Sequence, residues 1–188
     1  MKRIAIFASG NGTNAENIIR YFKQSTDITV DIVLSNNANA RVLDRSEKLS
    51  VPTATFSKDE FYKSSKVVDL LKEKAIDLVV LAGFMWLVPE NIITAFHEKI
   101  INIHPALLPK YGGKGMYGAH VHRAVSEAKE TSTGISIHYV NNKYDDGDII
   151  FQTSVSIKAG ENPDTIAEKI HVLEHRHFPV VIEEILLN

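Results

Sequence analysis

The apolar positions along the chain fall into two alternating patterns, short runs rich in apolar residues and longer segments of mixed character. The short runs occupy residues 4–8, 29–34, 53–56, 77–82 and 99–103; the first is wholly apolar, and each of the others contains one or two polar residues. Such runs are typical of strands that are buried on both faces of a parallel sheet. The segments between them are predicted to form helices at residues 14–23, 40–49 and 58–74. Strands that alternate with helices predict an α/β fold with a doubly wound, mostly parallel, Rossmann-like sheet.

The pattern changes in the last third of the chain. Residues 133–140 and 149–157 are predicted to be two strands joined by an acidic loop, which suggests an antiparallel addition to the sheet. Residues 163–187 are predicted to be a long helix that is interrupted or kinked near Pro179. We expect a single domain over residues 1–188, divided loosely near residue 100.

Composition narrows the classes of function. The chain has 188 residues and no cysteine, so disulfides, thiolate metal sites and cysteine nucleophiles are excluded. A formal net charge of −2 does not favour nucleic acid or a membrane surface as a partner. Because Gly10 and Asn11 end the first apolar stretch, this stretch is too short for a signal peptide or a membrane span. A cytoplasmic protein that binds small molecules is therefore expected.

A glycine-rich loop follows the first predicted strand. The sequence from Gly10 to Ala15 has the form G-x-G-x-x-A and precedes a predicted helix. Gly12 lets the backbone approach an anion, the helix start offers free N–H groups, and Thr13 and Asn14 add side-chain donors. A dinucleotide site would also need a carboxylate after the second strand, but residues 35–37 are Ser-Asn-Asn. The loop is interpreted as a site for a single phosphate; the alternative is a tight turn without a ligand.

Asn102 and His104 lie two residues apart at the end of the fifth predicted strand. Alternation along a strand places both side chains on one side, at the sheet edge where ligands of open α/β folds bind. An amide beside an imidazole is suited to stabilising an oxyanion on a carbonyl under attack. A structural histidine is the alternative. Pro105 and Pro109 stiffen the following loop, and either is a candidate for a cis peptide bond.

These motifs together resemble the glycinamide ribonucleotide formyltransferases of purine biosynthesis. The matching segments lie in order over nearly the whole chain: Ser-Gly-Asn-Gly-Thr-Asn at 9–14, Leu-Ala-Gly-Phe-Met at 81–85, Asn-Ile-His-Pro at 102–105, Leu-Leu-Pro at 107–109, Asp145 with Gly147, and Glu-His at 174–175. The Asn-x-His-Pro motif is shared by the wider formyltransferase group. The glycine-rich loop is what indicates the ribonucleotide substrate.

The resemblance implies a formyltransferase fold and a role for each matched residue. Asn102, His104 and Asp145 would be catalytic in formyl transfer from 10-formyltetrahydrofolate, with Asp145 favouring a protonated His104. Gly12, Thr13, Asn14 and Glu174 would bind the ribonucleotide. The folate would contact Lys58, Met85, Trp86, Leu87, Val88, Asn102, Asn141 and Tyr144. Trp86 departs from the polar residue expected there, and core packing is an equal alternative for it. Residues 1–100 would then be the phosphate-binding half, and residues 101–188 the catalytic and folate-binding half.

Several features stay open at the level of sequence. The acidic loop with Asp145, and the histidine pairs at 120 and 122 and at 171 and 175, could suggest a metal, but their spacings fit poorly and none is expected. For His171, His175 and His177 we favour capping or packing, and His120 and His122 are expected to face different ways on a helix. Residues 111–118 contain four glycines and form either a mobile lid or a passive loop. A sugar N-formyltransferase, a formyltetrahydrofolate deformylase and a non-catalytic nucleotide-binding module are the alternatives in function. A monomer and a homodimer are both compatible with the sequence.

Overall fold

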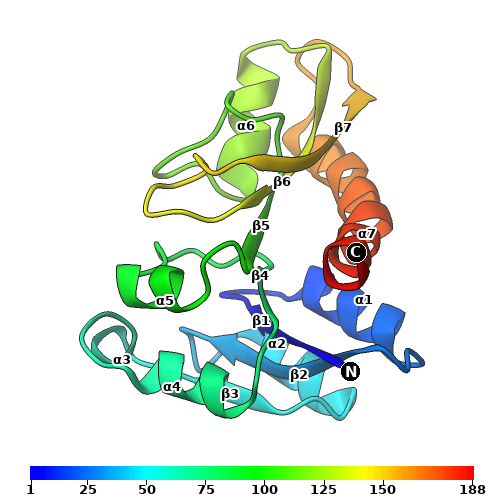
Figure 1. Cartoon of the computed structure of the whole chain (residues 1–188). Helices are drawn as coiled ribbons and strands as arrows, with labels where there is room; N and C mark the ends of the chain where they lie inside the picture. The colour runs from blue at the N-terminus through cyan, green and yellow to red at the C-terminus, as the bar shows by residue number, and fades with distance from the viewer.

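The structure, a computed structural model, describes residues 1–188 and contains one seven-stranded sheet flanked by helices (Figure 1). The strands are β1 (Lys2–Phe7), β2 (Ile28–Ser35), β3 (Thr53–Thr55), β4 (Leu78–Leu81), β5 (Ile100–His104), β6 (Ser132–Tyr139) and β7 (Ile149–Ser156). The helices are α1 (Thr13–Phe22), α2 (Arg41–Lys48), α3 (Lys58–Tyr62), α4 (Lys66–Glu73), α5 (Glu90–Ala95), α6 (Ala119–Glu127) and α7 (Pro163–Leu187).

The strand order across the sheet is β3-β2-β1-β4-β5-β6-β7. The first five strands pair in parallel, and β6 and β7 are added antiparallel. The chain moves outward from β1 to β3 and then returns to place β4 on the other side of β1. The order therefore reverses between β1 and β4, where open α/β sheets bind their ligands. The predicted fold class, including the antiparallel addition, is confirmed.

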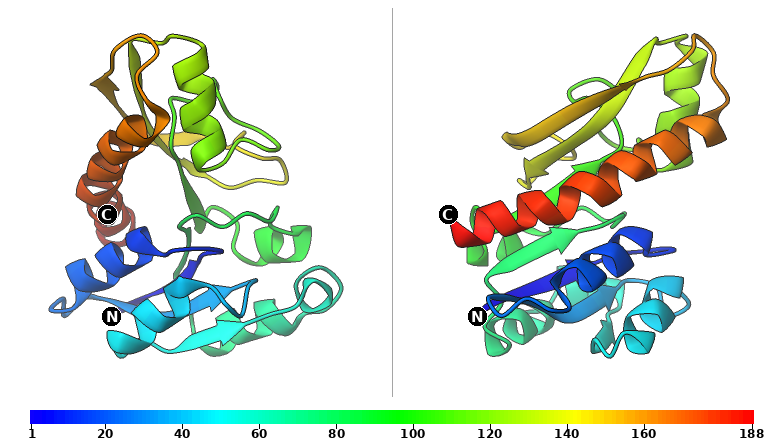
Figure 2. Two further views of the ribbon diagram at one scale, coloured as in Figure 1. Left: turned by 180° about the vertical axis from the view of Figure 1, so that it is seen from behind. Right: turned by 90° about the vertical axis from the view of Figure 1, so that its right-hand side faces the viewer.

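Helices cover both faces of the sheet and divide the apolar core into two clusters. One cluster joins the sheet to α1, α2, α6 and α7, and the other joins it to α3, α4 and α5. Figures 1 and 2 show α1 and α7 lying side by side on the face of the sheet that α1, α2, α6 and α7 cover. Because the central parallel strands β1, β4 and β5 lie between these two layers, most of their residues are buried, which explains their apolar sequences.

The predicted helix over residues 58–74 is wrong, because the structure divides it into α3 and α4. Ser57 and Glu60 form a reciprocal capping box at the start of α3. The helix ends at Lys63, whose backbone leaves the helical region, and the Ser64 hydroxyl donates to the Glu60 carbonyl. Serine side chains that bond to nearby backbone groups compete with helix propagation, so Ser64 and Ser65 separate the two helices.

Helix α7 is continuous through Pro179, so the expected interruption is absent. Proline has no N–H to donate to the carbonyl four residues earlier, which here belongs to His175. The Asn17 side chain of α1 donates to that carbonyl instead, at 2.8 Å. An amide on the neighbouring helix thus replaces the missing backbone bond and fixes α7 against α1.

Asn17→Ala should lower the free energy of unfolding by about 1–2 kcal/mol, because it leaves a partly buried carbonyl without a donor. Chemical denaturation measures the change, with Asn142→Ala on an exposed loop as the control. In a Pro179→Ala background the residue 179 N–H is restored, so adding Asn17→Ala should cost clearly less. Equal costs in both backgrounds would contradict the proposed replacement of the backbone bond.

Candidate active site

A cleft of about 600 Å³ opens at the carboxyl ends of β1, β4 and β5. Its lining comes from segments far apart in the sequence: residues 10–14, 82–85, 102–105 and 113–118, together with His122, Tyr144, Asp145, His171 and Glu174. The loops after β1 and β4 are tied together, since the Ser9 N–H donates to the Gly83 carbonyl at 3.0 Å and the Met85 N–H donates to the Ser9 hydroxyl at 3.0 Å. The reversal of strand order therefore produces a preformed cleft.

The glycine-rich loop forms one end of the cleft. Gly12 has φ of 77° and packs so closely on Val42 that an added Cβ would lie 2.4 Å from its side chain. The Val42 N–H also donates to the Gly10 carbonyl at 3.1 Å. Helix α1 begins directly afterwards at Thr13, so its free N–H groups face the cleft. This geometry suits an anion, as the sequence predicted.

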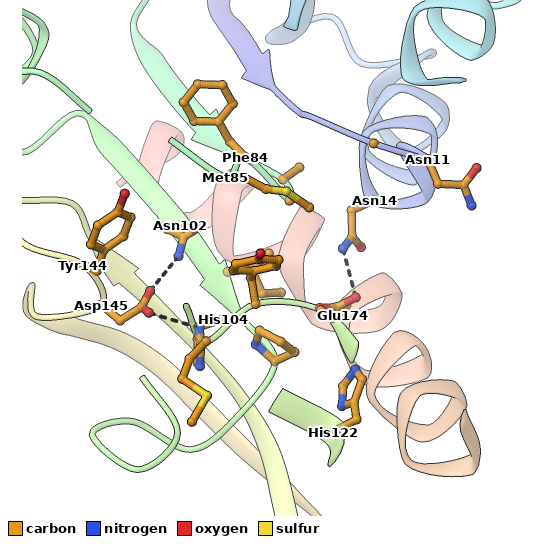
Figure 3. Close-up of a pocket in the computed structure, with 18 of the residues that line it drawn as sticks. Asn11, Asn14, Phe84, Met85, Asn102, His104, His122, Tyr144, Asp145 and Glu174 are labelled. Carbon is orange, nitrogen blue, oxygen red and sulfur yellow. Dashed lines mark hydrogen bonds and ion pairs between the residues drawn. The ribbon is translucent and has the colours of Figure 1, made fainter. Parts of the chain in front are cut away.

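The other end of the cleft brings Asn102, His104 and Asp145 together (Figure 3). Asn102 and His104 project from β5, and His104 is buried. Asp145 places Oδ2 at 3.5 Å from Nδ1 of His104 and Oδ1 at 3.5 Å from Nδ2 of Asn102. Its backbone has φ of 52°, a left-handed conformation that aspartate tolerates. The Gly113 N–H donates to Oδ2 at 2.9 Å and holds the carboxylate in place.

His138 on β6 fixes the amide of Asn102. The Nδ1 atom of His138 donates to the Tyr139 carbonyl at 2.8 Å, because a carbonyl can only accept. In the neutral ring, Nε2 is then an acceptor and lies 3.1 Å from Nδ2 of Asn102. One N–H of Asn102 is thereby occupied. The other makes only the weak contact with Asp145 and remains available to an acceptor on a ligand.

Burial sets the resting charge of His104. It lowers the pKa of His104 below its ordinary value, although the charge of Asp145 and the Tyr111 carbonyl, 2.8 Å from Nε2, act in the opposite direction. The sequence interpretation of His104 as charged therefore needs correction for the resting state, in which the ring is mostly neutral at pH 7. Once protonated, the ring donates to both acceptors, so a proton received during a reaction is stabilised there.

Asp145 itself stays ionised. Burial acts to raise the pKa of Asp145, but the imidazoles of His138 and His104, whenever they are protonated, and the Gly113 N–H outweigh it. The pKa therefore lies below its ordinary value, and the carboxylate keeps its charge at neutral pH. The favourable influence of Asp145 on a protonated His104, expected from the sequence, is present in the structure.

Glu174 of α7 reaches the glycine-rich loop from across the cleft. Its Oε2 accepts a hydrogen bond from Nδ2 of Asn14 at 2.9 Å (Figure 3). The side chain is buried, and burial raises the pKa of Glu174 above its ordinary value, against the lowering effect of Asn14. The structure thus brings these two residues of the predicted ribonucleotide site into contact, although they are 160 positions apart.

Comparisons with known proteins agree with this site. The sequence model described as formyl transferase matches residues 2–182. The phosphoribosylglycinamide formyltransferase of Bacillus subtilis is 34% identical over 99% of this chain and 95% of its own length.

The chain belongs to the formyl transferase family.

Two further relatives carry the same name. The chloroplastic enzyme of Arabidopsis thaliana is 35% identical to this chain over 96% of the chain's residues. The matched part covers 64% of the length of the Arabidopsis protein. The crystal structure from Bacillus halodurans has a TM-score of 0.87 and 37% identity, covering 100% of this chain and 96% of that one. The resemblance to the glycinamide ribonucleotide formyltransferases is therefore confirmed over nearly the whole chain.

Next to the main cleft, the formyl transferase has a smaller cavity of about 50 Å³. Most of the residues predicted to bind folate line one or both of these spaces: Met85, Trp86, Leu87, Val88, Asn102 and Tyr144. Lys58 and Asn141 line neither; Lys58 is exposed at the start of α3, and the Asn141 amide donates to Asp146 at 3.3 Å.

Trp86 combines core packing, one of the two roles that the sequence left open, with a place at a cavity wall. It packs in an aromatic cluster with Phe56, Phe61, Tyr62 and Phe84, with ring centroids 5.8–6.4 Å apart. It also lines the smaller cavity of the formyl transferase. The Tyr62 hydroxyl donates to the Leu87 carbonyl at 3.0 Å and ties α3 to this segment. The indole is therefore held rigidly at the cavity wall.

Some lining residues of the formyl transferase carried no clear signal in the sequence. His122 and His171 line the cleft, whereas the sequence favoured capping or packing for His171 and assigned no role to His122. Their exposure to a cavity depends on how α6 and α7 meet the sheet, which helical spacing alone does not reveal. Residues 113–118 also line the cleft. Of the two proline candidates, the bond between Leu108 and Pro109 is cis.

Two negative findings complete the description. No three or more histidine, aspartate or glutamate side chains are grouped so that they could hold a metal ion. None of the helices combines the length and apolar character needed to cross a membrane.

Proposed function

We propose that this formyl transferase transfers the formyl group of 10-formyltetrahydrofolate to the amine of phosphoribosylglycinamide, a step of purine biosynthesis. The observation that carries the proposal is one cleft with an anion-binding loop at one end and Asn102, His104 and Asp145 at the other. A phosphate bound at residues 10–14 would place the remainder of a ribonucleotide along the cleft toward His104. The names of the full-length relatives support the same substrate.

The residues present fit a folate. The main cleft has the volume that such a ligand needs, and at its side the smaller cavity joins Asn102 to an apolar wall that includes Leu87, Val88 and the ring of Tyr144, which suits a flat aromatic group. When bound, 10-formyltetrahydrofolate supplies the formyl carbon that the amine attacks. We assign its binding to the residues predicted from the sequence, with Lys58 and Asn141 reserved for the outer parts of the ligand. Residues 1–100 and 101–188 form the phosphate-binding and catalytic halves of this proposal.

The side chains have complementary tasks in the transfer. The free N–H of Asn102 donates to the formyl oxygen as negative charge develops on it. His104, neutral at rest, receives the proton lost by the attacking amine, directly or through Asp145, and the positive charge of the ring then stabilises the oxyanion through space. Asp145 and the Tyr111 carbonyl stabilise that charged ring. His104 then returns the proton to the departing folate nitrogen, so the protein ends in its starting state without a covalent intermediate.

The decisive experiment mixes the pure protein with 10-formyltetrahydrofolate and phosphoribosylglycinamide and follows tetrahydrofolate release. We expect release that depends on both substrates. Release without the amine would indicate a deformylase, and release only with an amino sugar would indicate a sugar N-formyltransferase. No release under any condition would support a non-catalytic nucleotide-binding module. Sedimentation of the same sample distinguishes the monomer from the homodimer.

A further inference from the structure

His122, a buried histidine on α6, has no task in the proposed reaction although it lines the same cleft. Its side chain is 5% exposed, and its Nδ1 atom is buried without a hydrogen-bond partner. Burying a polar atom without a partner costs free energy, so nearly all such atoms in folded proteins are paired. An unpaired nitrogen in the wall of a binding cleft indicates that a ligand supplies the missing partner.

The same wall carries a second unpaired atom. Oδ1 of Asn14 is buried and has no partner, while its Nδ2 donates to Glu174. Figure 3 shows Glu174 between Asn14 and His122. These three side chains come from α1, α7 and α6, and all three line the cleft. A ligand seated here would meet two atoms that the protein itself leaves unpaired, Nδ1 of His122 and Oδ1 of Asn14.

The protonation states of these groups favour a hydroxyl group of the ligand as the missing hydrogen-bond partner. Burial, together with smaller effects of the neighbouring His171 and His104, lowers the pKa of His122 to about 4, so the ring is neutral at pH 7. A neutral imidazole offers one donor and one acceptor. Glu174, whose pKa is raised, has the same dual capacity when protonated. A hydroxyl also donates and accepts, whereas a phosphate only accepts and is better bound by cations.

The position of His122 agrees with this chemistry. The sugar of a ribonucleotide connects its phosphate to the group that carries the amine, so it must cross the middle of the cleft between residues 10–14 and His104. His122 is close enough to both His104 and His171 for their charges to influence it. We propose that His122 is a specificity-determining residue that hydrogen-bonds a ribose hydroxyl of the acceptor ribonucleotide. The proposal rests on the proposed function, because that function identifies the sugar.

The test compares substrates as well as variants. The kcat/KM of the wild-type enzyme is measured with phosphoribosylglycinamide and with its 2′-deoxy and 3′-deoxy analogues, at saturating 10-formyltetrahydrofolate. We expect one deoxy analogue to be used about tenfold less well. In His122→Leu that preference should fall to about twofold or less, because the discriminating hydrogen bond is absent. His120→Leu, which alters the exposed histidine of the same helix, should keep the wild-type preference.

Each outcome has a defined meaning. A lower activity of His122→Leu with an unchanged preference would show a merely structural role and overturn the proposal. A wild-type enzyme without preference for either hydroxyl would overturn it independently of any variant. His122→Asn carries an amide near the position of Nδ1 and should retain the preference; a folded Asn variant without it also contradicts the proposal. Failure of the proposed function itself is distinguishable, since the wild type would then not use phosphoribosylglycinamide at all.

Discussion

His104→Ala should reduce kcat about 10³-fold or more, because one substitution removes both the proton carrier and the positive charge that stabilises the oxyanion. The rate of tetrahydrofolate release measures the loss. KM should change much less, since His104 interacts most strongly in the transition state. His104 is only 3% exposed, so thermal unfolding must show that the variant still folds.

His97→Ala is the matched control for this prediction. His97 lies shortly before β5 and is exposed, so its removal should leave kcat within about twofold. If folded His104→Ala retained more than about one tenth of the wild-type kcat, His104 would have to be removed from the mechanism. A loss confined to KM would instead assign His104 to substrate binding.

Asp145→Asn should lower kcat by roughly 10²–10³-fold, since it removes the charge that stabilises protonated His104 while it preserves the size of the side chain. Asp146→Asn is the control. Asp146 is exposed and contacts only the neighbouring Lys143 and Asn141, so its loss should have little effect. Comparable effects of the two substitutions would show that bulk charge, not the position of Asp145, matters.

The pH profile of Asp145→Asn provides a second readout. In our mechanism kcat/KM falls on the acid side as free His104 becomes protonated and can no longer accept a proton. The charge of Asp145 raises the pKa of His104, so its removal lowers that pKa further. The acid limb of the residual activity should therefore move to lower pH than in the wild type. Movement to higher pH would contradict the assigned coupling.

Much of the fold follows from local patterns in the sequence. The apolar runs located the strands within one or two residues. This is because few positions of a buried parallel strand face solvent, so most of its residues are apolar. The break between α3 and α4 was missed, since it depends on Ser64 bonding to the backbone rather than on apolar spacing. The continuity of α7 through Pro179 was also missed, because its donor comes from Asn17 on another helix.

In the candidate site too, features set by neighbouring residues could be predicted from the sequence, whereas features set by tertiary contacts could not. Asn102 and His104 share a face because they are two residues apart on one strand, so sequence sufficed to place them together. The role of His138 depends on the antiparallel register that sets it opposite Asn102. The resting charge of His104 depends on how completely the loop with Tyr111 and the strand β6 cover it, and only a structure gives that burial.

The bond between Asn14 and Glu174 links two positions separated by 160 residues. Such a contact costs more loop-closure entropy than a local one, and other contacts of the fold must offset that cost. Before α7 has docked, one wall of the cleft is missing, and the ribonucleotide finds only the isolated glycine-rich loop. Substrate binding is thus coupled to completion of the whole fold, and a cell rich in the nucleotide shifts newly made chains toward the native state by mass action.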